Sequence, residues 1–149
     1  MNQIVLLDSG PLGLVTSPSG SGEAAKCRDW FNQVIASGTT MIVPEIADYE
    51  VRRELIRADK VRGITRLDAL IAQVDYLPIT TNAMRQAAAY WANARQQGRP
   101  TAADPALDGD VILAAQAATL NWTDVVVATT NVRHLSRFVQ AEIWSDIAG

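Results

Sequence analysis

The stretch Ile4-Val5-Leu6-Leu7-Asp8-Ser9-Gly10-Pro11 passes abruptly from four apolar residues to turn-forming ones at Asp8. Four consecutive aliphatic residues are typical of a short strand that is buried on both faces, as in a parallel sheet. Asp, Ser, Gly and Pro favour turns, so the strand is expected to end at Asp8. Ligands bind at the carboxyl ends of strands in open parallel sheets, which makes Asp8 a candidate site residue. The alternative is an Asx-turn residue that satisfies only local backbone N–H groups.

The length and composition suit one globular domain that spans residues 1–149. The chain is 48% apolar and 19% charged, a balance found in folded rather than disordered proteins. No apolar run approaches the roughly 18–20 residues needed to cross a bilayer. The first residues also lack the basic start and the cleavage site of a secretory signal. We therefore expect a cytoplasmic protein without a membrane segment.

Cysteine and histidine are scarce in this sequence. The chain has one of each, Cys27 and His134. Cys27 lies in an amphipathic segment with Trp30 and Phe31, and it is expected to fill the core. These counts exclude a zinc cluster of Cys and His ligands, so any metal must be held by oxygen atoms.

Short apolar runs alternate with longer segments of helical periodicity along the chain. The expected strands cover residues 4–7, 40–43, 75–79, 124–128 and 141–144. The expected helices cover 11–15, 23–37, 44–58, 61–73 and 83–97, and residues 98–100 end the last of these. A further helix is expected from residue 104 or 108 to about 120. Residues 16–22 are expected to form a loop. Strands that alternate with helices predict an α/β fold: three α/β/α layers around a central, mostly parallel sheet.

Acidic and amide side chains recur near the ends of the expected strands. Asp8 follows the first strand, Glu50 lies in the helix after the second, Asp108 and Asp110 begin a later helix, and Asn131 follows the fourth strand. In a parallel sheet these residues converge on one edge. Converging carboxylates repel one another unless a cation is present, and an all-oxygen site suits Mg²⁺ or Mn²⁺. The chemistry that such a site favours is phosphodiester hydrolysis.

Each of these residues also has a purely structural interpretation. Asp108 is as well placed to cap a helix as to bind a metal. Asp110 in a first helical turn is favoured by the helix dipole whatever its function. Asn131 suits a turn that caps the next element. Glu50 is the exception, because it borders the apolar row of its helix and the sequence offers no structural role for it there.

Four blocks of sequence together resemble the PIN-domain ribonucleases of the VapC toxin type. In chain order the blocks are Leu7-Asp8-Ser9, Pro44 with Glu50 six residues later, residues 110–117 (DVILAAQA) and residues 129–135 (TTNVRHL). The blocks span residues 4–138 and are weak singly, but in this order they are fairly specific. The resemblance implies a PIN-like fold over the whole chain.

The resemblance also implies a function and a site. It implies a metal-dependent endoribonuclease, the toxin of a toxin–antitoxin pair, that uses Mg²⁺ or Mn²⁺ and leaves a 5′-phosphate and a 3′-hydroxyl. Asp8, Glu50 and Asp110 are then the metal-binding acids, and Asn131 completes the catalytic set at a position often filled by Asp. Asp108 is a further metal-ligand candidate that partly compensates for the charge that Asn131 lacks.

The partners of the chain are less constrained by the sequence. Net charge is −3, which argues against binding nucleic acid through overall positive charge. Basic residues nevertheless gather between 52 and 66. Three roles are open for them: contact with RNA phosphate, a solvated helix face, or a docking surface for an inhibitory antitoxin. The RNA-contact candidates are Arg52, Arg53, Arg57, Ser9 and Thr129. We also expect a homodimer.

Two other function classes are weighed against the nuclease. An aspartyl-phosphate enzyme needs a second Asp where Ser9 or Gly10 stands, and a P-loop motif is absent from the sequence. The remaining alternative is a catalytically weakened PIN-like module that binds RNA or protein. Asn131 favours that alternative, whereas the retention of three mutually repelling acids opposes it.

Overall fold

The computed structural model describes residues 3–97, 104–121 and 124–148. Within them, five strands form one parallel sheet in the order β3-β2-β1-β4-β5. The strands are β1 (Ile4–Leu7), β2 (Thr40–Pro44), β3 (Asp75–Leu77), β4 (Val125–Thr129) and β5 (Ala141–Ile143). The helices are α1 (Ser9–Thr16), α2 (Gly22–Ala36), α3 (Glu45–Arg57), α4 (Val61–Gln73), α5 (Thr81–Gln96), α6 (Asp104–Ala118) and α7 (Val132–Leu135), with a 3₁₀ turn η1 (Trp144–Asp146).

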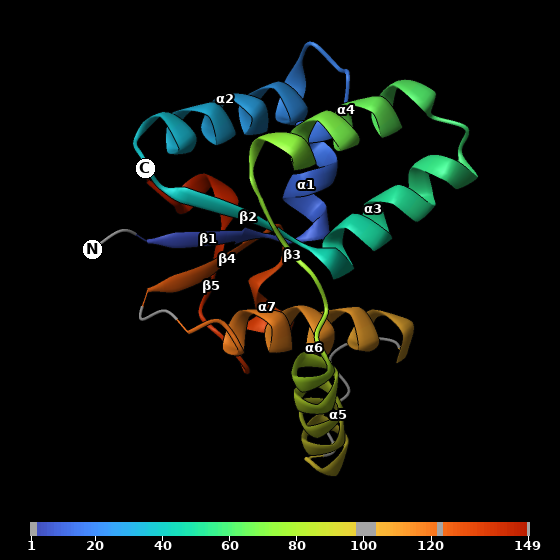
Figure 1. Ribbon diagram of the computed structural model, residues 1–149, viewed down its shortest axis with the longest axis vertical. Helices are drawn as coiled ribbons and strands as arrows, with labels where there is room; N and C mark the ends of the chain where they lie inside the picture. The colour runs from blue at the N-terminus through green and yellow to red at the C-terminus, as the bar shows by residue number, and fades with distance from the viewer. Residues whose placement is uncertain (1–2, 98–103, 122–123, 149) are drawn as a thin grey trace.

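Helices cover both faces of the sheet, as Figure 1 shows. Alternate residues of the fully buried strand β1 point to opposite faces. Val5 and Leu7 belong to the core beneath α1 to α4, which also contains the buried thiol of Cys27. Ile4 and Leu6 belong to the core on the α6 and α7 side. The predicted three-layer α/β/α fold is confirmed, and every strand pair is parallel.

Most element boundaries lie within two residues of the predicted ones, and three of the small differences have local causes. Helix α1 begins at Ser9 rather than at residue 11, because Asp8 caps it. Thr16 belongs to that helix and not to the expected loop, since its hydroxyl is buried and donates to the carbonyl of Leu12. Strand β3 ends before Pro78, whose ring nitrogen carries no hydrogen for the sheet. The predicted helix end at residues 98–100 lies outside the described residues.

The sheet topology places the carboxyl ends of β1 and β4 side by side. Leu7 pairs with Ala128, so the residues that follow these strands are neighbours. Strand β2 flanks β1 on the other side and leads directly into α3. None of the helices in the described part of the chain is long and apolar enough to cross a membrane.

Candidate active site

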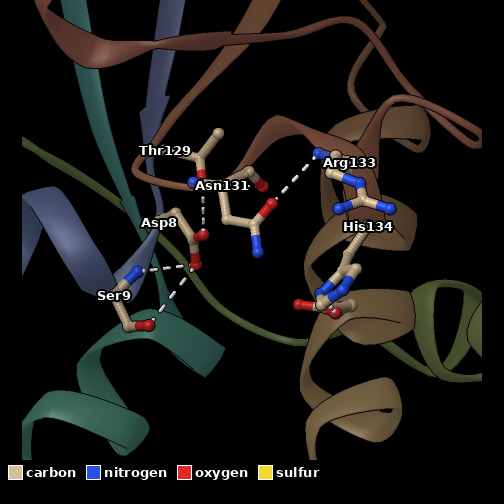
Figure 2. A network of polar contacts seen from close by, with 7 residues as sticks. Asp8, Ser9, Thr129, Asn131, Arg133 and His134 are labelled. Carbon is tan, nitrogen blue, oxygen red and sulfur yellow. Dashed lines mark hydrogen bonds and ion pairs between the residues drawn. The ribbon is translucent and has the colours of Figure 1, made fainter. Parts of the chain in front are cut away.

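Asp8 is fixed where β1 ends and α1 begins. Its Oδ1 accepts a hydrogen bond from the backbone N–H of Ser9 at 2.7 Å, and its Oδ2 accepts one from the Thr129 hydroxyl at 2.8 Å. Its own N–H donates to the carbonyl of Ala128 at 2.9 Å. The carboxylate is thus held by both neighbouring strands in one orientation, as Figure 2 shows.

Glu50 reaches the same region from α3 and lies against α6. A Cβ atom built on Gly109 would stand 2.5 Å from Oε2 of Glu50. The carboxylate therefore occupies the space that any side chain other than hydrogen at position 109 would take. This close approach places Glu50 beside Asp110, the next residue of α6.

Asp110 presents an oxygen without a hydrogen-bond donor. Its Oδ2 is buried and accepts no hydrogen bond of good geometry from the described residues. The imidazole of His134 approaches it, with Nδ1 3.3 Å from that oxygen. Buried polar atoms are almost always paired, so this oxygen is a candidate ligand for a cation.

The three carboxylates interact through their charges. Burial raises the pKa of Asp8, and the Thr129 and Ser9 hydrogen bonds oppose the rise. Burial, then the charge of Asp8, raises the pKa of Glu50, with a smaller contribution from Asp110. Burial and the charge of Asp8 raise the pKa of Asp110 to about 6, although His134 opposes the rise. Three acids that resist ionisation together are electrostatically suited to a divalent cation.

The donor set fits a hard divalent cation, although the side chains do not form a closed cage. All three acids supply oxygen, the ligand that Mg²⁺ and Mn²⁺ prefer, and one oxygen is buried without a partner. Among the described residues, no three acidic, Cys or His side chains already stand close enough to hold one ion. A cation shared by these acids would therefore require some of their side chains to shift.

Asp108 does not join this group. It is exposed and lines a hollow between α5 and α6 together with Met84, Trp91 and Val111. Two residues along a helix turn the side chain by about 200°, so Asp108 and Asp110 point to opposite sides of α6. This separation of the two acids follows from the helical period and can be read from the sequence alone.

The basic residues of α3 have different surroundings. Arg52 forms ion pairs with Asp48 at 3.0 Å and with Asp68 at 2.8 Å, and is thereby committed to joining α3 to α4. Arg53 lies 3.9 Å from Glu50 and over the ring of Tyr49. It is therefore the arginine of this helix that borders the acids.

Arg57 and the two predicted hydroxyl contacts complete the set of RNA-contact candidates. Arg57 is exposed and pairs with Glu54 at the far end of α3. Ser9 lies beside Asp8, with its hydroxyl 3.5 Å from Oδ1. The Thr129 side chain is buried and donates to Asp8, so it supports the acid.

The end of β4 supplies Asn131 and His134. Asn131 caps α7, and its backbone N–H donates to the Thr129 hydroxyl at 3.0 Å. His134 follows in α7 and reaches Asp110. His134 lies within the family-like block 129–135, but the sequence gives it no role. Gly109 was not predicted as a site residue, and the signal that points to it is a glycine beside an acid within a helix.

Comparison with known proteins assigns the family. The family model of the PIN domain matches residues 5–143. The chain belongs to the PIN-domain family. No curated protein sequence is significantly similar to this PIN domain.

Solved structures share the fold of this PIN domain. VapBC2 from Rickettsia felis, bound to a DNA fragment from its promoter, matches with a TM-score of 0.72 and 14% identity over 95% of this chain and 99% of the other. VapBC-1 from nontypeable Haemophilus influenzae matches with a TM-score of 0.67 and 19% identity over 97% and 100%. DNA-bound VapBC from Salmonella typhimurium matches with a TM-score of 0.65 and 20% identity over 97% and 99%. At these identities the likeness establishes the fold.

Proposed function

We propose that this PIN domain is a metal-dependent endoribonuclease and the toxin component of a toxin–antitoxin pair. The observation that carries the proposal is the grouping of Asp8, Glu50 and Asp110, which come from three separate elements. The charge of Asp8 raises the pKa of both other acids. A fold has no structural need to gather mutually repelling acids at one strand edge. A divalent ion and a phosphodiester substrate give the grouping a purpose.

Asp8, Glu50 and Asp110 would hold the ion, and Mg²⁺ and Mn²⁺ both fit oxygen ligands. A bound ion supplies a water of lowered pKa and stabilises charge on the phosphate. Thr129 and Ser9 keep the Asp8 carboxylate in one orientation by donating to its two oxygens. Burial of Asp8 and Asp110 keeps bulk water from screening their charge. Asn131 completes the proposed catalytic set.

Arg53 and Arg57 are the proposed RNA contacts of α3, and Ser9 is a proposed contact beside Asp8. Arg53 stands half-exposed at the border of the acids, where a phosphate next to the scissile one would pass. Arg52 is withdrawn from this role, because two carboxylates already satisfy its guanidinium. Asp108 is likewise withdrawn from the ligand set by its exposed position.

The proposed partner is an antitoxin protein. The structural neighbours of this chain are solved as VapBC complexes, which supports a partner of that kind here. A homodimer is also proposed, and the large exposed side chains of Met84 and Trp91 on α5 are compatible with it. Molar mass by light scattering, with and without a co-expressed candidate antitoxin, tests both partners.

The experiment that tests the proposed activity is cleavage of a mixed RNA pool by the purified protein with Mg²⁺, with Mn²⁺ and with EDTA. Asp8→Asn is the matched variant, since it keeps the helix cap and removes the charge. We expect cleavage with either metal, none with EDTA and a loss of at least a hundredfold in Asp8→Asn. An uninhibited, folded protein that cleaves nothing would contradict the proposal.

The second candidate is a PIN-like module that binds RNA or protein without cleaving. Asn131 favours it, because this amide contributes no negative charge next to the three acids. RNA binding that persists in EDTA, together with no cleavage in either metal, would support the module.

A further inference from the structure

The side chain of Asn131 is oriented by a helix cap. Its Oδ1 accepts a hydrogen bond from the backbone N–H of Arg133 at 3.2 Å, which satisfies a free donor in the first turn of α7. The cap is braced by Thr129, whose hydroxyl accepts the backbone N–H of Asn131 and donates to Asp8. The position of the Asn131 amide is therefore coupled to that of Asp8.

The cap determines which end of the amide faces the acids. Only the oxygen of an amide accepts a hydrogen bond, so Oδ1 must be the atom turned toward Arg133. Reversing the amide would bring two donors together and lose the cap. Figure 2 shows the Asn131 nitrogen, Nδ2, directed into the space between Asp8 and His134.

Nδ2 is a free donor in that position. Among the described residues it donates no hydrogen bond, and the Asn131 side chain is exposed at the mouth of the site. An amide NH₂ group has two hydrogens to donate and does not bind a hard cation. It suits an anionic oxygen that arrives from solvent.

We propose that Asn131 binds a non-bridging oxygen of the RNA phosphodiester through Nδ2, and that it is not a metal ligand. This inference rests on the proposed nuclease function and names the substrate contact made at that site. Asn at this position keeps the cap that Asp would also provide and replaces a repulsive charge with a donor.

The test uses two substitutions that each keep an oxygen for the cap. Asn131→Ser keeps a cap acceptor and removes the NH₂ group, and Asn131→Asp keeps the cap and presents a carboxylate in its place. Asn32→Ser, on the exposed side of α2, is the matched control. The measurements are KM for a short RNA, the Mn²⁺ dissociation constant by electron paramagnetic resonance, and the melting temperature.

We expect Asn131→Ser to raise KM by about tenfold to a hundredfold, the effect of one hydrogen bond to a charged group. The Mn²⁺ dissociation constant of Asn131→Ser should stay within about twofold of wild type. For Asn32→Ser, both KM and the Mn²⁺ dissociation constant should stay within about twofold of wild type. Asn131→Asp should bind Mn²⁺ more tightly and RNA more weakly, because its charge attracts the metal and repels the phosphate.

Two results would overturn the inference while the wild-type enzyme remains active. One is an Asn131→Ser protein that loses Mn²⁺ affinity with KM unchanged, which would make Asn131 a ligand. The other is an Asn131→Ser protein with both constants unchanged. Failure of the proposed function itself is seen separately, as folded wild-type protein that cleaves no RNA with either metal, whether or not it binds RNA.

Discussion

Gly109 is the residue that allows the acid-bearing helices α3 and α6 to approach each other. The Glu50 carboxylate occupies the position of a Cβ atom at residue 109, and Asp110 follows directly. Glycine in a helix costs roughly 0.5–1 kcal/mol relative to alanine. A destabilising residue beside two acids is therefore expected to serve the site more than the fold.

Replacing Gly109 by alanine should separate stability from activity. The three atoms nearest to the added methyl group all belong to the carboxylate at the flexible end of Glu50, so we expect the carboxylate to move while the backbone stays in place. We expect the free energy of unfolding to hold or rise by up to about 0.5–1 kcal/mol, with at least tenfold weaker Mn²⁺ binding and a comparable loss of cleavage. Urea denaturation and metal titration measure the two effects.

The control is Gly13→Ala in α1, where an added methyl group meets no atom. It should gain similar stability and keep full cleavage. Equal cleavage by the two alanine variants would remove Gly109 from the site.

The sequence predicted which acids lie near one another better than it predicted the directions of their side chains. Asp8, Glu50 and Asp110 could be named because strand ends and helix starts in a parallel sheet meet at one edge. The helical period separates the side chain of Asp108 from that of Asp110, since two residues along a helix point to opposite sides. The donor end of Asn131 could not be foreseen, because it depends on a cap whose partner, Arg133, belongs to a four-residue helix with no apolar period of its own.

At the scale of the elements, Gln116 joins three parts of the chain. This buried side chain of α6 accepts from the N–H of Ile46 in the first turn of α3 and donates to the carbonyl of Leu77 at the end of β3. The N–H groups of a first helical turn have no partner within the helix. Gln116 thus holds α3, which carries Glu50, against α6, which carries Asp110.

Gln116→Met should weaken both the fold and the site. Methionine has a similar shape but leaves the Ile46 N–H and the Leu77 carbonyl without partners, at a cost of about 2 kcal/mol or more. We expect a lower urea midpoint and, at temperatures where the variant is still folded, a weaker affinity for Mn²⁺. Unchanged metal affinity in the folded variant would limit Gln116 to a structural role.

Two arginines of helix α3 are predicted to have different roles, Arg52 in stability and Arg53 in RNA binding. Arg52→Gln removes pairs to Asp48 and Asp68 and should lower the free energy of unfolding by about 1 kcal/mol, with KM unchanged. Arg53→Gln should leave stability nearly unchanged, raise KM and reduce the salt dependence of RNA binding, because one phosphate contact is lost. Titrations at several salt concentrations compare the two variants, and equal salt slopes for Arg53→Gln and wild type would contradict the assignment.

The strands and helices could be predicted where apolar runs and helix caps determine them locally. The strands were found because buried parallel strands are continuous apolar runs, and α4 (Val61–Gln73) matched its prediction at both ends. Thr80 caps α5, because its side chain accepts the N–H of Ala83. Helix α1 starts two residues before the predicted position because the side chain of Asp8 caps the helix directly, whereas Asp and Ser in the sequence are equally typical of a turn.

At the scale of the whole molecule, the acids connect stability to pH and metal. Asp110 binds its proton more tightly in the folded protein, with a pKa of about 6 against an ordinary value of about 4. Between these values the folded state holds more protons than the unfolded state, so stability falls as pH rises from about 4 through about 6. Asp8 and Glu50, whose pKa values are also raised, act in the same direction.

Mn²⁺ should restore the stability that is lost as the pH rises, because it binds the ionised acids of the folded state alone. At pH 7.5 and about a hundredfold excess over its dissociation constant, Mn²⁺ should stabilise by about 2.7 kcal/mol, which raises the melting temperature by roughly 5–10 °C. At pH 5 the shift should be much smaller, since protons compete for the same oxygens. Asp110→Asn should melt above metal-free wild type at pH 7.5 and respond little to Mn²⁺. Asp108→Asn, two residues away and exposed, should behave as wild type; the same response in both variants would mean that Asp110 has no special place in the site.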